Sequence, residues 1–152
     1  MNKDLLKLLD KAIMISTNAH YKQTDKAGIP YILHPIRVMM NVKTIPEKIV
    51  AILHDTLEDT ELTIGDLICF DYPQYIIDSI MLLTKKPNQT YKEYLIKIKE
   101  NKIARNVKIA DMRDNSDILR YHDLEEKHLK MTKKYHKGIQ MLTEDIEIIT
   151  RL

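Results

Sequence analysis

The sequence has no tryptophan and is poor in glycine, cysteine and phenylalanine, with three, one and one in 152 residues. So few glycines disfavour both a glycine-rich phosphate loop and a turn-rich β architecture. The single cysteine, Cys69, excludes an intrachain disulfide and is typical of a reducing compartment. Apolar runs are far shorter than the roughly 20 residues that cross a bilayer, and the chain does not begin with a signal-peptide pattern. We therefore expect a cytoplasmic protein without a membrane partner.

Neither sign of charge is in large excess: 24 lysines and arginines face 22 aspartates and glutamates, a formal net charge of +2. A protein held on nucleic acid mainly by phosphate contacts would carry a larger basic excess, so no nucleic-acid partner is expected. A small anionic ligand stays open, because a few local cations suffice to bind it. The length fits one domain with a buried core, which we predict to span residues 1–152.

Apolar residues recur at helical spacing along most of the chain, and prolines, glycines and capping residues punctuate them. Two segments, 31–33 and 146–149, have the composition of short strands, but helical patterns flank both. We therefore predict an all-α fold, a single compact helical bundle. Its expected helices run over Lys3–Gln23, Pro35–Val42, Pro46–Leu57, a short turn at Thr63–Asp66, Pro73–Leu83, a helix capped at Thr90–Glu93, Lys102–Asp117 and Leu124–Leu142.

The end of the third predicted helix carries four groups that bind metals or move protons, in the stretch His54-Asp55-Thr56-Leu57-Glu58-Asp59. On a continuous helix Glu58 lies one turn after His54, and Asp59 lies one turn after Asp55. Apolar residues precede them, so ionised carboxylates there need a compensating cation, which a divalent metal supplies. The alternative is a helix end whose acids point into solvent and whose histidine bonds a carbonyl; this motif alone leaves both open.

Two further segments carry a histidine and an aspartate with notable neighbours. His34 precedes Pro35, and the rigid backbone there suits a ligand held in one rotamer, although a lone histidine is more often structural. Asp111 has Lys108 three residues before it and Asn115 four after it, all on one helical stripe. The alternative for this stripe is a weak surface ion pair, but asparagine is a poor helix former and calls for another reason.

Together the three segments offer a nitrogen and oxygen ligand set of two histidines and two aspartates: His34, His54, Asp55 and Asp111. Without thiolates this set suits Mn²⁺, Fe²⁺ or Zn²⁺ in a catalytic site rather than a structural cysteine-type zinc site. It also leaves coordination positions for water and substrate.

The order His34-Pro35, His54-Asp55-x-x-Glu58-Asp59 and Lys108-x-Ala110-Asp111-x-x-x-Asn115 resembles the HD-domain phosphohydrolase superfamily. More narrowly it is similar to the hydrolase domain of the RelA/SpoT proteins and to the stand-alone small alarmone hydrolases. The similarity runs from about residue 19 to residue 115, and it implies an HD-domain helical bundle.

The resemblance implies a (p)ppGpp 3′-pyrophosphohydrolase of the stringent response, which releases pyrophosphate from the 3′ position of guanosine tetra- or pentaphosphate. It implies Mn²⁺ as cofactor and a small nucleotide as substrate, and at this length no synthetase domain is expected beside the hydrolase. Its implied site residues are His34, His54, Asp55 and Asp111 as metal ligands, Glu58 and Asp59 as the groups that position and deprotonate water, and Lys26, Lys108 and Asn115 as substrate contacts.

One loop departs from the family pattern. The alarmone hydrolases typically have Arg-Lys-Ser-Gly before the Pro-Tyr-Ile element, whereas this chain has Asp25-Lys26-Ala27-Gly28, which replaces a cation with a carboxylate. Two alternatives therefore stay open: a phosphohydrolase for another nucleotide, such as a 3′- or 2′-phosphorylated adenine dinucleotide, and a non-catalytic nucleotide-sensing module. The Glu58-Asp59 pair disfavours the second. The basic segment 122–137 either borders a polyphosphate pocket or, more commonly for such a pattern, is a solvated helix face.

Overall fold

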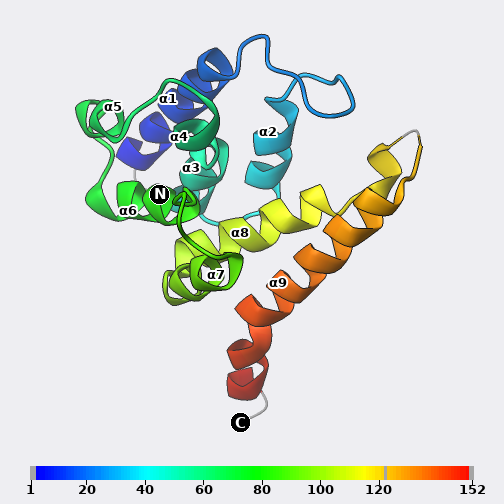
Figure 1. Ribbon diagram of the computed structural model, residues 1–152. Helices are drawn as coiled ribbons and strands as arrows, with labels where there is room; N and C mark the ends of the chain where they lie inside the picture. The colour runs from blue at the N-terminus through cyan, green and yellow to red at the C-terminus, as the bar shows by residue number, and fades with distance from the viewer. Residues whose placement is uncertain (1–2, 122, 151–152) are drawn as a thin grey trace.

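The computed structural model describes residues 3–121 and 123–150, with side chains through residue 144. Within those ranges the chain contains helices and no strand, apart from one isolated bridge between Thr24 and Pro30 (Figure 1). The all-α prediction is confirmed. The helices are α1 (Lys3–Ala19), α2 (Leu33–Met40), α3 (Ile45–Leu53), α4 (Thr56–Asp59), α5 (Ile64–Cys69), α6 (Gln74–Leu83), α7 (Tyr91–Glu100), α8 (Lys102–Asn115), the 3₁₀ turn η1 (Ile118–Arg120) and α9 (Glu126–Thr150).

Helix α3 lies at the centre, in contact with α1, α2, α6 and α8. Its residues 49–53 are completely buried, as expected of a helix that is apolar on every side. The helix begins at a capping box, in which the Thr44 hydroxyl accepts from Glu47 N and the Glu47 carboxylate accepts from Thr44 N. This central position carries the residues that follow α3 into the interior of the bundle.

The helix predicted over Pro46–Leu57 is wrong as one unit, because α3 ends at Leu53 and α4 begins at Thr56. Two side chains bond to backbone carbonyls at the end of α3. His54 Nδ1 lies 2.7 Å from Ala51 O, and Thr56 Oγ1 donates to Leu53 O over 2.7 Å. Such bonds satisfy the acceptors that a helix end leaves open. The expected alignment of Glu58 with His54 along one continuous helix is therefore also wrong.

Other predicted boundaries shift at the ends of helices. The first helix ends at Ala19 rather than Gln23, and Lys22 just beyond it has a left-handed φ of 64°. Helix α8 ends at Asn115, since the Asp117 side chain accepts from Leu119 N and caps η1 instead. The strand-like segments 31–33 and 146–149 form no strand: Leu33 begins α2, and 146–149 lie within α9.

Helix α9 packs along α8 and α7, and its last turns project beyond the other helices (Figure 1). Close packing is possible because residue 138 is a glycine. A Cβ there would lie 2.8 Å from Tyr91 Oη and 2.9 Å from Met112 Sδ, which is too close without a shift. Among the described helices, none combines the length and apolar character needed to cross a membrane.

Candidate metal centre and nucleotide cavity

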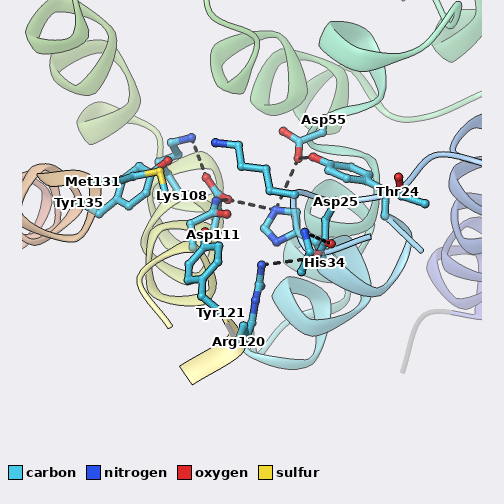
Figure 2. A pocket seen from close by; sticks show the side chains of 14 residues that line it. Thr24, Asp25, His34, Asp55, Lys108, Asp111, Arg120, Tyr121, Met131 and Tyr135 are labelled. Atoms are coloured by element: carbon cyan, nitrogen blue, oxygen red, sulfur yellow. Dashed lines mark hydrogen bonds and ion pairs between the residues drawn. The ribbon is translucent and has the colours of Figure 1, made fainter. Parts of the chain in front are cut away.

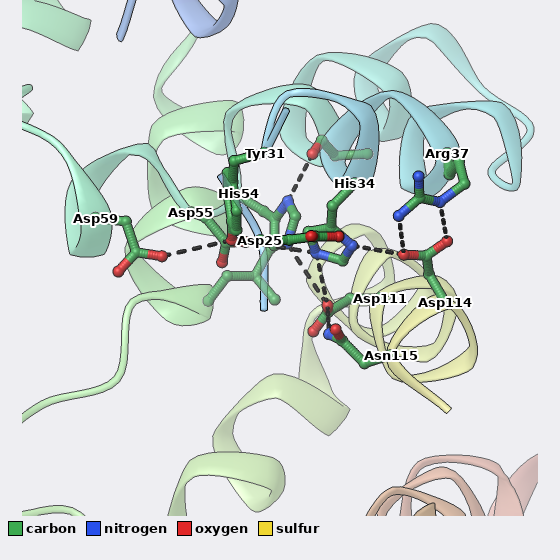
Figure 3. A network of polar contacts seen from close by, with 12 residues as sticks. Asp25, Tyr31, His34, Arg37, His54, Asp55, Asp59, Asp111, Asp114 and Asn115 are labelled. Atoms are coloured by element: carbon green, nitrogen blue, oxygen red, sulfur yellow. Dashed lines mark hydrogen bonds and ion pairs between the residues drawn. The ribbon is translucent and has the colours of Figure 1, made fainter. Parts of the chain in front are cut away.

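The four predicted metal ligands meet at one point between α2, α8 and the junction of α3 with α4 (Figure 3). His34 Nε2 lies 3.2 Å from Asp111 Oδ1 and 3.5 Å from Asp55 Oδ2. His54 Nε2 lies 2.9 Å from Asp55 Oδ2 and 3.7 Å from Asp111 Oδ1. Two nitrogens and two carboxylate oxygens thus face a common centre, and only the Asp55 side chain is more than slightly exposed.

The state of the two histidines fits a cation at that centre. The carbonyl of Ala51 only accepts, so the proton of neutral His54 sits on Nδ1 and the lone pair on Nε2 faces the carboxylates. That Nε2 is buried and has no hydrogen-bond partner among the described residues. His34 has the same arrangement, with Nδ1 at 2.7 Å from Asp114 Oδ2. Outer bonds of this kind orient metal-binding imidazoles.

The potential at the centre is strongly negative. Burial lowers the pKa of His34 and His54, but the aspartates around them outweigh it and raise the pKa to about 11 and about 9. Burial would raise the pKa of Asp55 and Asp111, but His54 and Lys108 respectively dominate and hold both well below the ordinary range. A divalent cation satisfies the same two carboxylates without protonating the histidines.

Lys108 and Asn115 lie where a substrate contact was predicted, but their polar ends hold Asp111. Lys108 Nζ donates to Asp111 Oδ2 over 2.7 Å, and Asn115 Nδ2 donates to Asp111 Oδ1 over 2.6 Å. Burial lowers the pKa of Lys108, but Asp111 raises it well above the ordinary value, so this lysine stays charged. Both side chains also line the cavity in front of the centre.

Asp59 and Glu58 take different positions on α4. Tyr31 Oη donates to Asp55 Oδ2 over 2.6 Å and lies 3.5 Å from Asp59 Oδ2, which connects Asp59 to the ligand cluster. The Glu58 carboxylate instead accepts from the backbone N of Lys85. Burial raises the pKa of both carboxylates, and the charge of Asp55 raises them further. A raised pKa suits a group that accepts a proton near neutral pH.

A cavity of about 430 Å³ opens onto the centre (Figure 2). Its inner wall is formed by His34, Asp55, Lys108, Asp111 and Asn115, with Tyr31. Its outer wall is formed by the loop Thr24–Ala27, Arg120 and Tyr121, and Met131 and Tyr135 of α9. Lys26, a predicted substrate contact, lies on this outer wall and is exposed.

The departure at position 25 has a structural explanation. Asp25 Oδ1 accepts from Ala27 N over 2.9 Å and from Ile29 N over 3.0 Å, so the carboxylate closes its own loop. Gly28 completes the turn with a left-handed φ of 76°. Asp25 Oδ2 lies 3.7 Å from Arg120 Nη2. The carboxylate at position 25 is therefore paired with a cation from a distant segment of the same outer wall.

Several residues of the site were not predicted from the sequence. Tyr31 and Asp114 contact the ligand set directly; Asp114 lies one turn after Asp111, a spacing that was available as a signal. Gln23 donates from Nε2 to Asp59 O over 2.8 Å, and its Oε1 lies 2.7 Å from His20 Nδ1, so this pair ties α4 to the end of α1. Arg120 had no local signal.

The basic segment 122–137, of which residue 122 lies outside the described residues, was predicted either to border a pocket or to form a solvated helix face. The structure shows some of each. Met131 and Tyr135 border the cavity. Lys127 and Lys130 instead form exposed ion pairs with Glu125 and Glu126, at 2.7 and 3.0 Å. Most of the lysines there lie on a solvated face.

Known proteins share parts of this sequence and its fold. No protein-family model matches the chain. The bifunctional (p)ppGpp synthase/hydrolase SpoT of Escherichia coli K12 is 38% identical over 69 residues, which cover 43% of this chain and 10% of SpoT. A GTP pyrophosphokinase of Streptomyces coelicolor is 27% identical over 137 residues, 82% of this chain and 16% of that protein.

A solved structure of a metazoan ortholog of SpoT, described as hydrolyzing ppGpp, matches with a TM-score of 0.70 and 19% identity, over 95% of this chain and 94% of that one. The chain therefore shares the helical fold of that SpoT ortholog. The predicted resemblance and fold class are both confirmed. The matched part of the chain spans about a tenth of the length of the first curated relatives.

Proposed function

We propose that the chain is a metal-dependent phosphohydrolase that releases pyrophosphate from the 3′ position of guanosine 3′,5′-bis(diphosphate). The observation that carries this proposal is the buried group of His34, His54 and Asp111, whose ligand atoms lie within 4.8 Å of one another, with Asp55 Oδ2 at 2.9 Å from His54 Nε2. That Nε2 has no hydrogen-bond partner among the described residues. The likeness to the SpoT hydrolases supports the choice of nucleotide.

In the proposed reaction His34, His54, Asp55 and Asp111 would hold one divalent cation, which would supply Lewis acidity to activate water and positive charge to neutralise the phosphates. Asp59, held beside the ligands by Tyr31, takes a proton from the attacking water, and Glu58 helps to position that water. The water oxygen bonds to the phosphorus next to the ribose as the bond from that phosphorus to the 3′ oxygen breaks. The proton that Asp59 took from the water passes to the leaving 3′ oxygen, so the products are pyrophosphate and a nucleoside 3′ hydroxyl. Lys108 and Asn115 keep Asp111 oriented while they face the substrate.

We further propose Mn²⁺ as the native ion, with Fe²⁺ or Zn²⁺ as alternatives that the mixed nitrogen and oxygen donors also suit. The lone Cys69 supports a cytoplasmic location. Residues 1–152 as one domain, and a nucleotide as the partner rather than nucleic acid or a membrane, remain parts of this proposal.

A second candidate is hydrolysis of another phosphorylated nucleotide, which the carboxylate at position 25 favours. The test is a Mn²⁺-supplemented screen of guanosine and adenosine 3′,5′-polyphosphates together with NADPH, which separates released phosphate from pyrophosphate. We expect pyrophosphate from the guanosine 3′-diphosphates, released at least about 100-fold more slowly by the Asp59→Asn variant. Phosphate release from NADPH alone would establish the second candidate, and no release from any nucleotide would refute both.

A further inference from the structure

Arg120 places a guanidinium on the outer wall of the cavity. Its side chain reaches from the end of η1 toward Asp25 and His34 (Figure 2). Nη1 donates to Asp114 Oδ2 over 2.6 Å, and Nη2 lies 3.7 Å from Asp25 Oδ2. The side chain is 23% exposed, so it contacts both the protein and the space of the cavity.

Neither carboxylate depends on Arg120. Asp114 already accepts from Arg37 Nε over 2.6 Å and from Arg37 Nη2 over 3.0 Å, and it pairs with His34 Nδ1 at 2.7 Å. Asp25 accepts from two backbone amides of its own loop. A guanidinium has five donors, and toward described residues the hydrogen bonds of Arg120 come from Nη1 alone. Its remaining donors are therefore available to a ligand.

The outer wall of the cavity has few cationic side chains that could bind a phosphate. Among the described residues that line the cavity the lysines and arginines are Lys26, Lys108 and Arg120, and Lys108 is committed to Asp111. A nucleotide that reacts through its 3′ phosphates has those phosphates at the ligand cluster. Phosphates at its other end then need cations elsewhere on the wall, where Arg120 and Lys26 lie.

We propose that Arg120 is the anion-binding residue for the phosphates that do not react, and that it selects nucleotides phosphorylated at both ends of the ribose. This inference rests on the proposed function, because it takes the ligand cluster as the reacting end. A guanidinium suits the role, since its planar fork matches two phosphate oxygens at once.

The competing explanation is that Arg120 only supports Asp114 and, through it, His34. Arg37 provides a matched control, because it donates to the same carboxylate but is not among the described residues that line the cavity. If Arg120 only supported Asp114, then Arg120→Gln and Arg37→Gln would have the same effects.

The test compares Arg120→Gln and Arg37→Gln with the unmodified chain, on guanosine 3′,5′-bis(diphosphate) and on guanosine 3′-diphosphate with a free 5′ hydroxyl. We expect kcat/KM of the unmodified chain to favour the first nucleotide by about 10- to 100-fold, the worth of a charge-assisted contact. Arg120→Gln removes most of that preference through KM, with kcat and bound metal nearly unchanged. Arg37→Gln keeps the preference, and Arg120→Lys restores part of it.

A binding arm separates this inference from the proposed function. Calorimetric affinities for the same two nucleotides, measured in EDTA, involve no turnover. If the unmodified chain hydrolyses neither nucleotide but binds the bis(diphosphate) in an Arg120-dependent way, the proposed function fails and the inference stands. If Arg120→Gln keeps the preference in both assays, or loses it together with Arg37→Gln and bound metal, the inference is overturned.

Discussion

At the metal centre behind the inner wall of the cavity His34, His54 and Asp111 are buried, and each side chain is held by a second bond to the protein. On the outer wall Asp25 and Arg120 are partly exposed, and they meet only because two distant segments fold together. Substitutions on the inner wall should therefore abolish metal binding and chemistry. Those on the outer wall should change which nucleotide is accepted.

The largest effect is expected for His54→Ala, which removes a proposed ligand from the metal centre. We expect loss of stoichiometric metal and a fall in activity of at least about 1000-fold, because the cation supplies several kcal/mol to the reaction. Elemental analysis and a hydrolysis assay measure both. The exposed His136→Ala should leave both unchanged, and a His54→Ala protein that keeps its metal would refute the ligand assignment.

Asp59→Asn should separate chemistry from metal binding at the same centre. Loss of a general base costs about 100- to 10,000-fold in rate, while the four ligands, and so the bound metal, remain. Glu58→Gln should cost less, because the Glu58 carboxylate bonds Lys85 N rather than Tyr31. Unchanged turnover in both variants would contradict the assigned role in activating water.

Asp114 connects the metal centre with the outer wall, since its carboxylate bonds both His34 and Arg120. The next test is Asp114→Asn. We expect about 10- to 100-fold weaker metal binding, the usual cost of removing an outer partner of a ligating histidine. Competition with a chelator measures it. Asp117→Asn, which only alters the cap of η1, is the control, and equal affinities in the two variants would show that Asp114 does not orient His34.

The smallest effect is expected for Glu47, in the capping box at the start of α3. Burial raises the pKa of Glu47, but hydrogen bonds from Thr44 and Asn106 outweigh it and hold the pKa below its ordinary value of 4.5. The ionised side chain therefore stabilises the fold fully above about pH 4.5, and this contribution is lost as pH falls through the lowered pKa. Glu47→Gln should lower the free energy of unfolding by about 1 kcal/mol near neutral pH, and by less in acid.

Urea unfolding at several pH values measures this difference, with the exposed Glu61→Gln as control. A difference between Glu47→Gln and the unmodified chain that stays constant into acid would show that the Glu47 charge is not responsible.

The sequence was informative where the determining contacts are local. Helical spacing and capping residues located most helices, and the same spacing placed Lys108 and Asn115 on either side of Asp111. The break after Leu53 was missed, because periodicity does not register side-chain bonds to the last carbonyls of a helix. Arg120 was missed for another reason: it contacts Asp114 across the turn after α8 and Asp25 from a distant segment, and helical spacing reveals neither contact.

Gly138 helps to set the width of the cavity, although it is not one of the residues that line it. The hydrogen at its Cα lets α9 rest against Tyr91 and Met112, and α9 in turn carries Tyr135 to the outer wall. A methyl group added at residue 138 would shift α9 away from α7 and α8, or displace Tyr91 and Met112. Either shift would move the part of the outer wall that α9 forms. The volume of the cavity is thus adjustable by mutation at a residue that does not line it.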